Sequence, residues 1–123
     1  MHPSDIMGQA YIEALYFTDT GPDSDIDSWA DLAPDVEGHA WRACEAFLAS
    51  LDPDTLSRLL GAVQAGHITL DQIGHDLWLT RNGHGTGLWD RGLGELGDSL
   101  TQAAKAMGEA YAYLGDDGLI YVS

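Results

Sequence analysis

Apolar residues recur at intervals of three and four in five stretches of the chain, a spacing typical of one face of an α-helix. The expected helices cover about residues 4–17, 34–51, 53–66, 70–82 and 93–107. Their apolar stripes, in chain order, are Met7, Ala10, Tyr11, Ala14 and Leu15; Val36, Ala40, Cys44, Phe47, Leu48 and Leu51; Leu56, Leu59, Leu60 and Val63; Leu70, Ile73 and Leu77; and Leu96, Leu100, Ala103, Ala104 and Met107. The pattern therefore predicts a mainly helical protein.

Residues that favour helix starts mark the first three boundaries. Ser4 is the expected N-cap of the first helix, and Pro34 suits the first position of the second. Asp52 followed by Pro53 is typical of a cap and a first-turn proline, so it begins the third helix. Because only a few residues separate the second and third helices, we expect them to form an antiparallel hairpin.

The fourth and fifth helices have equally clear boundaries. Thr69 with Gln72 three residues later is a capping-box pattern, which places a helix start near Leu70. This helix should end at Asn82-Gly83, and the fifth should end at Gly108, since glycine readily adopts the left-handed conformation that follows many helices.

The C-terminal residues change to the pattern of a β-hairpin. Two short apolar runs, 111–114 and 119–122, flank the turn sequence Gly-Asp-Asp-Gly at 115–118. A two-stranded ribbon is not stable alone in water, so one face must pack on the helices, and Tyr113 and Tyr121 are expected to supply part of that contact. The fold class is a small α+β single domain over residues 1–123, helical from 4 to 108, with a C-terminal two-stranded antiparallel hairpin at 110–122.

Composition limits the class of protein and its expected location in the cell. At 123 residues with 45% apolar content, the chain is long enough to bury a core without disulfides or metals. Its lone cysteine, Cys44, lies on an apolar stripe and is expected to be buried. The chain has no basic, apolar leader and no apolar run long enough to span a bilayer, which predicts a soluble cytoplasmic protein without membrane contact.

Charge points to the kind of partner. Twenty acidic and five basic residues give a formal net charge of −15, which argues against direct binding to nucleic acid. The same field attracts basic protein surfaces, including nucleic-acid-binding channels. Part of this acidity forms a run without Lys or Arg, made up of Asp19, Asp23, Asp25, Asp27, Asp31, Asp35 and Glu37. Such a run either mimics the phosphates of a nucleic acid or is a solvated loop that only aids solubility.

The segment from Gly74 to Gly92, GHDLWLTRNGHGTGLWDRG, is unusually rich in side chains that bind ligands or make hydrogen bonds. Its candidate site residues are His75, Asp76, Trp78, Arg81, Asn82, His84, Trp89, Asp90 and Arg91. One interpretation is a metal site made by His75, Asp76, His84 and Asp90, whose nitrogen and oxygen atoms suit zinc, iron or manganese. The spacing supports this weakly, because neighbouring helical residues point about 100° apart and no His-x-x-x-His pair is present.

The other interpretation of this segment, which we favour, is structural or partner-binding. Arg81, Asn82, Asp90 and Arg91 would fix an irregular loop through ion pairs and amide hydrogen bonds. Trp78 and Trp89 would anchor that loop to the core, and close backbone approaches would explain Gly83, Gly85 and Gly87. A rigid loop that presents Arg, His and Trp also has the composition of a protein-binding hot spot.

The motif segment and the hairpin together carry a resemblance. The sequence GHDLWLTRNGHGTGLWDRG, the following helix and YLGDDGLIY resemble a family of small acidic proteins encoded by bacteriophages, prophages and plasmids, whose pattern is GHDFWLTRNGHGxGFWDR followed by YxGDDGxIY. YIEALYFTDT and DLAPD near the N-terminus are also similar, whereas Leu77 and Leu88 stand where that family usually has aromatic residues. The resemblance implies a mobile-element setting and brings no catalytic residue or ligand with it.

These observations lead to one functional expectation and its alternatives. We expect a non-enzymatic accessory protein without a cofactor, acting in the host cytoplasm as a nucleic-acid-mimicking inhibitor of a host defence protein, of the anti-restriction or anti-CRISPR kind. Its partner would be a host protein with a basic nucleic-acid-binding surface. The alternatives are a small metal-dependent enzyme that uses residues 75–90, and a structural or adaptor protein without mimicry. The oligomeric state is left open.

Overall fold

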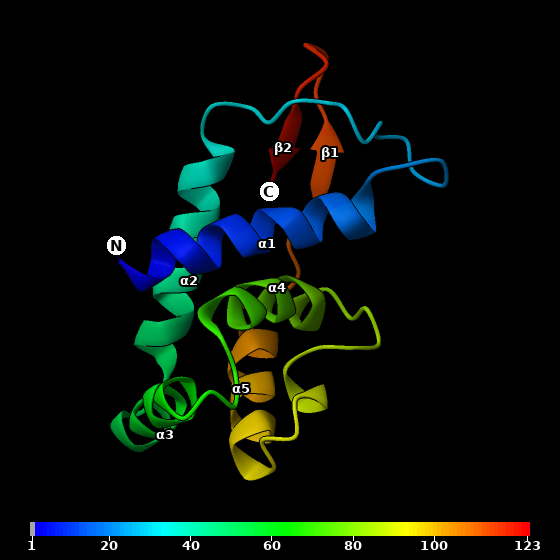
Figure 1. Ribbon diagram of the computed structural model, residues 1–123. Coiled ribbons are helices and arrows are strands. Elements are labelled where there is room, and N and C mark those ends of the chain that lie inside the picture. The colour runs from blue at the N-terminus through cyan, green and yellow to red at the C-terminus, as the bar shows by residue number, and fades with distance from the viewer. Residues whose placement is uncertain (1) are drawn as a thin grey trace.

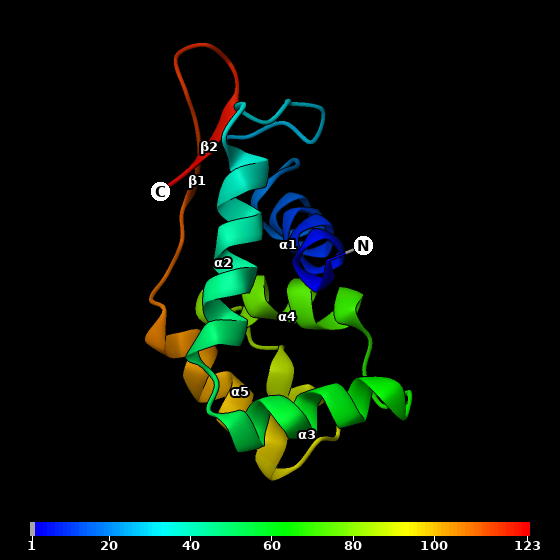
Figure 2. The same ribbon diagram turned by 90° about the vertical axis from the view of Figure 1, so that its left-hand side faces the viewer.

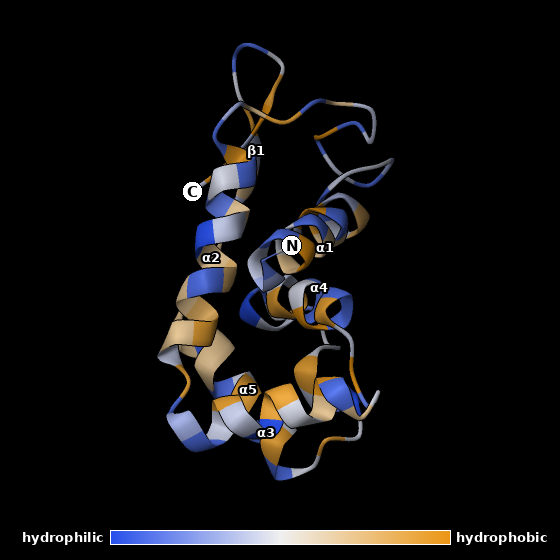
Figure 3. Ribbon diagram, turned by 60° about the vertical axis from the view of Figure 1, so that its left-hand side comes forward, coloured by the Kyte–Doolittle hydropathy of each residue, from blue (hydrophilic) through white to orange (hydrophobic). Residues whose placement is uncertain are grey.

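The computed structural model describes residues 2–123 and confirms the expected order of five helices and a C-terminal hairpin (Figure 1). The elements are α1 (Pro3–Asp19), α2 (Val36–Ser50), α3 (Pro53–Gln64), α4 (Leu70–Arg81), a 3₁₀ helix η1 (Leu88–Asp90), α5 (Glu95–Ala106), β1 (Ala112–Leu114) and β2 (Ile120–Val122). Each helix carries both hydrophobic and hydrophilic residues (Figure 3), as amphipathic helices do. Among the described residues, no helix combines the length and the apolar composition needed to cross a membrane.

The centre of the molecule is the contact between α1 and α4. The two helices approach so closely that a Cβ atom on Gly74 would overlap the backbone of Met7. Trp78 is fully buried beside Tyr11, with their rings edge to face at a centroid distance of 5.2 Å. α2 packs on α1, and α5 packs on α4, so these four helices enclose the core.

The second and third helices do not form the expected antiparallel hairpin. α2 runs along the long axis of the molecule, and α3 lies across its end beside α5 (Figure 2). The reason is local: Leu51 and Asp52 both have extended backbone conformations, so the chain turns a corner between the helices. Leu59 is buried but Leu60, which we placed on the same stripe, is 47% exposed, because neighbouring residues of a helix point about 100° apart.

Three helix starts also differ from the prediction. α1 begins earlier, because the His2 side chain accepts from the Ser4 N–H and the Asp5 carboxylate accepts from the His2 N–H, whereas Ser4 itself is buried in the first turn. Pro34 lies before α2, whose N-cap is Asp35. The start of α5 is delayed to Glu95 by Gly94, which has a positive φ of 60°. The capping box of Thr69 and Gln72 is present as predicted.

The hairpin pairs Ala112 with Val122, Tyr113 with Tyr121 and Leu114 with Ile120. Contrary to expectation, Tyr113 and Tyr121 do not face the helices; they stack on each other with ring centroids 5.6 Å apart, and Tyr113 is 48% exposed. Side chains alternate between the two faces of a strand, so Ile120 takes the inner face and is fully buried.

Candidate functional site

The acidic loop, which we define as residues 20–35, is held in a defined shape. The Gly21 N–H donates to the Ile26 carbonyl at 2.9 Å, and the Tyr16 hydroxyl donates to the Ala30 carbonyl at 2.7 Å. Ile26 and Ala30 are buried as well. The loop is therefore closed on itself, packed into the core and joined to α1 through Tyr16.

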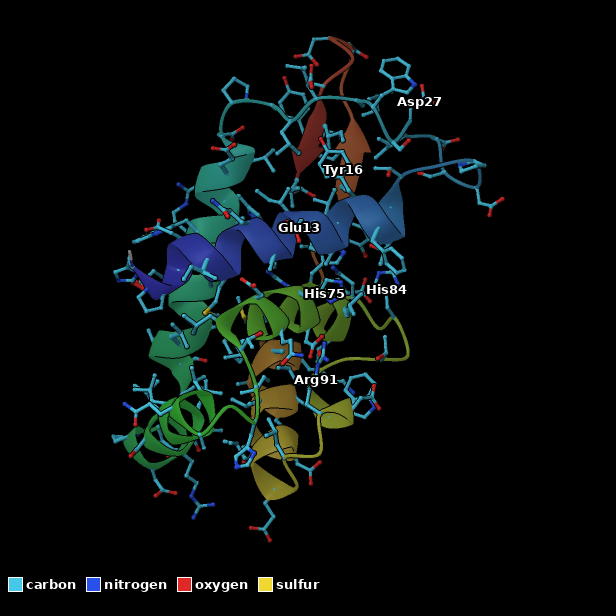
Figure 4. The ribbon with its side chains drawn as sticks, in the orientation of Figure 1. Glu13, Tyr16, Asp27, His75, His84 and Arg91 are labelled. Carbon is cyan, nitrogen blue, oxygen red and sulfur yellow. The ribbon has the colours of Figure 1, made fainter. Side chains whose placement is uncertain are left out.

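The side chains of this segment point outward. Of the seven acidic residues predicted as a partner-binding surface, only Asp19 is partly buried and the other six are exposed. In Figure 4, Asp27 lies on the loop beyond the end of α1, whereas Arg91 lies on the far side of α4. The structure thus places the run of carboxylates at one end of the molecule, away from that cation.

The hairpin turn joins this acidic end. Leu32 forms a parallel bridge with Ile120, the Ile120 N–H donates to the Asp31 carbonyl, and the Ala33 N–H donates to the Ile120 carbonyl. The exposed carboxylates of Asp116 and Asp117 are thereby brought to the same end as the loop (Figure 1). Sequence reasoning assigned these two residues only to the turn, because nothing local signals the pairing of residues 88 positions apart.

The acidic end also presents an aromatic side chain that the sequence analysis did not single out. Trp29, between Asp27 and Asp31, is 79% exposed. Its position outside every predicted apolar stripe was the sequence signal that could have indicated an exposed tryptophan. We call the seven predicted acidic residues, Asp116, Asp117 and Trp29 together the acidic surface.

Asp76 and Arg91 form the shortest ion pair of the motif segment. Arg91 donates from Nε to Asp76 Oδ2 at 2.6 Å and from Nη2 to Asp76 Oδ1 at 2.9 Å, and Asp76 is only 2% exposed. The hydrogen bond to Asp76 raises the pKa of Arg91 further. This pair ties α4 to the chain that follows η1.

Arg81 and Asn82 join the end of α4 to the end of α5. Arg81 donates from Nε to the Gly108 carbonyl at 2.9 Å and from Nη1 to the Tyr11 hydroxyl at 3.0 Å. It also donates to the Met107 carbonyl, so a cation lies at the C-terminus of α5, where the helix dipole favours it. Asn82 accepts from the Ala110 N–H at 2.9 Å.

The glycine-rich loop after α4 is fixed by Thr80 and Asp90. Buried Thr80, which we did not single out, accepts from the Leu88 N–H at 3.1 Å, and Asp90 accepts from the Gly87 N–H at 3.0 Å. Gly87 approaches Thr80 so closely that a Cβ atom would overlap it, as expected. Gly83 and Gly85 have a different cause: they meet nothing within 4 Å and have positive φ values of 69° and 78°.

The two tryptophans of the segment have different environments. Trp78 is a core residue, and its Nε1 donates to the Thr18 hydroxyl at 2.9 Å. Trp89 is 37% exposed, with Lys105 Nζ 5.8 Å from its ring centroid. Trp78 is therefore the anchor, and Trp89 lies at the surface.

The residues of the proposed metal alternative do not converge. Asp76 is paired with Arg91, and Asp90 caps the glycine loop. His75 Nδ1 lies 3.5 Å from Asp76, and His84 Nε2 lies 3.9 Å from Asp19. Within residues 2–123 no three His, Cys, Asp or Glu side chains are grouped to hold a metal ion. His84 instead connects the motif segment to the acidic surface.

Comparisons with protein-family models, with curated proteins and with solved structures found no match.

Proposed function

We propose that this protein is a non-enzymatic accessory protein of a phage or other mobile element that binds a basic, nucleic-acid-binding surface of a host protein. The observation that carries the proposal is the acidic surface itself. Its carboxylates are exposed except that of Asp19, which is partly buried, and the backbone that bears them is anchored by hydrogen bonds and by buried Ile26 and Ala30. Charges held in place before binding lose little freedom when the partner binds.

The charge distribution favours a cationic partner. Neither residues 19–37 nor residues 109–123 contain Lys or Arg, so no cation of these segments neutralises the surface. A field of one sign speeds the encounter with an oppositely charged surface and disfavours nucleic acid itself. Trp29 adds the kind of exposed aromatic side chain that dominates many protein interfaces.

In this proposal the motif segment has a structural part. The hydrogen bonds of Asp76, Arg81, Asn82, Asp90 and Arg91 fix α4 to the chain that follows it. The resemblance to mobile-element proteins supplies the setting, in which occupying a nucleic-acid channel inhibits host defence.

The test is an affinity pull-down from bacterial lysate at low and high salt, with identification by mass spectrometry. We expect a nucleic-acid-handling protein that is released at high salt, and whose nucleic acid competes with this protein. D23N/D25N/D27N should lose the partner, whereas D54N/D71N/D98N, which changes the same net charge at exposed sites on α3, α4 and α5, should retain it. Equal retention by both variants would reject the proposal.

A further inference from the structure

One edge of the hairpin is unpaired. Tyr111 and Ser123 exchange two backbone hydrogen bonds, and such pairs alternate along an antiparallel ladder, so Tyr113 and Tyr121 form the next hydrogen-bonded pair. The N–H and C=O groups of Ala112 and Leu114 therefore point away from β2, and no hydrogen bond among residues 2–123 engages them.

The other edge of the hairpin is covered. β2 pairs on its far side with the backbone of residues 31–33, through the bridge between Leu32 and Ile120. In the part of the chain that the structure describes, β1 is thus the open edge of this small sheet. An open edge is a template for an added strand.

A groove runs along this open edge. It has a volume of about 640 Å³ and lies between β1 and the chain around the start of the acidic loop. Its lining residues are Thr18, Asp19, Asp23, Ser24, Asp25, Ile26, Ala112, Tyr113 and Leu114. The groove therefore offers unpaired backbone groups on one side and three carboxylates on the other.

We propose that an extended basic segment of the partner binds in this groove and adds to β1 as a third strand. Its backbone pairs with Ala112 and Leu114, and its Lys or Arg side chains meet Asp19, Asp23 and Asp25. Strand addition of this kind derives affinity from main-chain hydrogen bonds and specificity from the side chains. The inference deepens the proposed function and rests on it, since it names the part of the basic partner that is recognised.

Charge decides between this occupant and a second copy of the chain. Pairing two β1 strands would bring two sets of groove carboxylates together, in molecules of net charge −15. Like charges placed close together oppose association, whereas a basic strand is attracted.

The experiment uses a short synthetic peptide of alternating Arg and Val, and the same peptide with N-methylated backbone amides. The second peptide keeps the charge but donates no backbone hydrogen bonds. We expect N-methylation to weaken binding by about tenfold or more. Amide hydrogen exchange should slow at Ala112 and Leu114 when the unmodified peptide binds, and change little at Tyr113, which is already paired with β2.

The protein variants test the charge component. D23N/D25N should lower the affinity for the unmodified peptide, and the matched variant D54N/D71N should leave that affinity unchanged. Equal binding of both peptides without new protection at Ala112 and Leu114 would overturn strand addition, as would failure of the unmodified peptide to bind. Neither result bears on the proposed function, which is rejected if the captured partner is retained equally by D23N/D25N/D27N and D54N/D71N/D98N.

Discussion

At the scale of single residues, most polar side chains of the motif segment make hydrogen bonds or ion pairs within the protein. Its arginines were predicted to form ion pairs and hydrogen bonds, but their partners were not predictable. Asp76 lies 15 positions from Arg91, and the hydroxyl of Tyr11 lies 70 positions from Arg81. Sequence proximity pointed instead to His75 and Asp76, which are neighbours with a weaker contact.

The Asp76–Arg91 pair gives the first prediction. Arg91→Ala leaves a buried carboxylate without its partner, and we expect the free energy of unfolding to fall by about 3 kcal/mol. Arg58→Ala breaks the exposed ion pair with Asp54 and should change the free energy of unfolding by less than about 1 kcal/mol. Urea unfolding of both variants measures the difference, and similar losses would contradict this account of the motif segment.

Cys44 gives a prediction about pH. Burial raises the pKa of its thiol from 9.0 to about 12, and burial likewise raises that of Tyr11 from 10.0 to about 12. From about pH 9 upward the unfolded chain binds fewer protons than the folded chain, so the free energy of unfolding should decrease as the pH rises towards 12. Well below pH 9 these two groups are protonated in both states and contribute no pH dependence.

A thiol reagent and alkaline unfolding curves measure this effect. Native protein at pH 8 should react very slowly, and denatured protein should release one thiol per chain. Cys44→Ala should abolish the reaction and reduce the alkaline loss of stability. Rapid labelling of the native protein would show that the thiol is accessible.

At the scale of elements, local signals predicted the order of helices and hairpin, although three helix starts differ by a few residues, and they did not predict how the elements pack. The capping box at Thr69 and the Gly-Asp-Asp-Gly turn involve residues only a few positions apart, so the sequence alone is enough to predict them. The corner between α2 and α3 depends on which surface each helix buries. Likewise, the inward face of β2 is set by Ile120 meeting the loop at Leu32. The acidic run was visible in the sequence, but its union with the hairpin turn and the groove along β1 required the fold.

The α1–α4 contact gives the third prediction, a pair of glycine substitutions. Gly74→Ala would push a methyl group into the backbone of Met7, and we expect a loss of about 3 kcal/mol of unfolding free energy or more. Gly61→Ala lies within α3 and meets nothing within 4 Å, so it should stabilise the protein by about 0.5–1 kcal/mol. Thermal unfolding should show a lower midpoint for Gly74→Ala and a higher midpoint for Gly61→Ala. A neutral Gly74→Ala would mean that the two helices can separate freely.

At the scale of the whole molecule, the fold concentrates charge. The five Lys and Arg residues lie on α2, α3, α4, the chain after η1 and α5, as Arg42, Arg58, Arg81, Arg91 and Lys105, whereas the charged groups of the acidic loop and the hairpin are all carboxylates. Folding brings these last two segments together through the Leu32–Ile120 bridge, so it places like charges near one another. Repulsion between these charges destabilises the folded state. In the proposed complex, the cationic partner would neutralise that repulsion.

The last prediction follows from that repulsion. Sodium chloride should raise the midpoint of thermal unfolding, because it screens repulsion between exposed charges over a Debye length of about 8 Å at physiological ionic strength. D23N/D25N/D27N should raise the midpoint at low salt and respond less to added salt. D54N/D71N/D98N has the same net charge but removes acids from the first turns of α3, α4 and α5, where the helix dipole favours them, so it should not raise the midpoint. Identical salt responses of the two variants would mean that repulsion is spread evenly over the molecule, and that the acidic surface carries no special share of it.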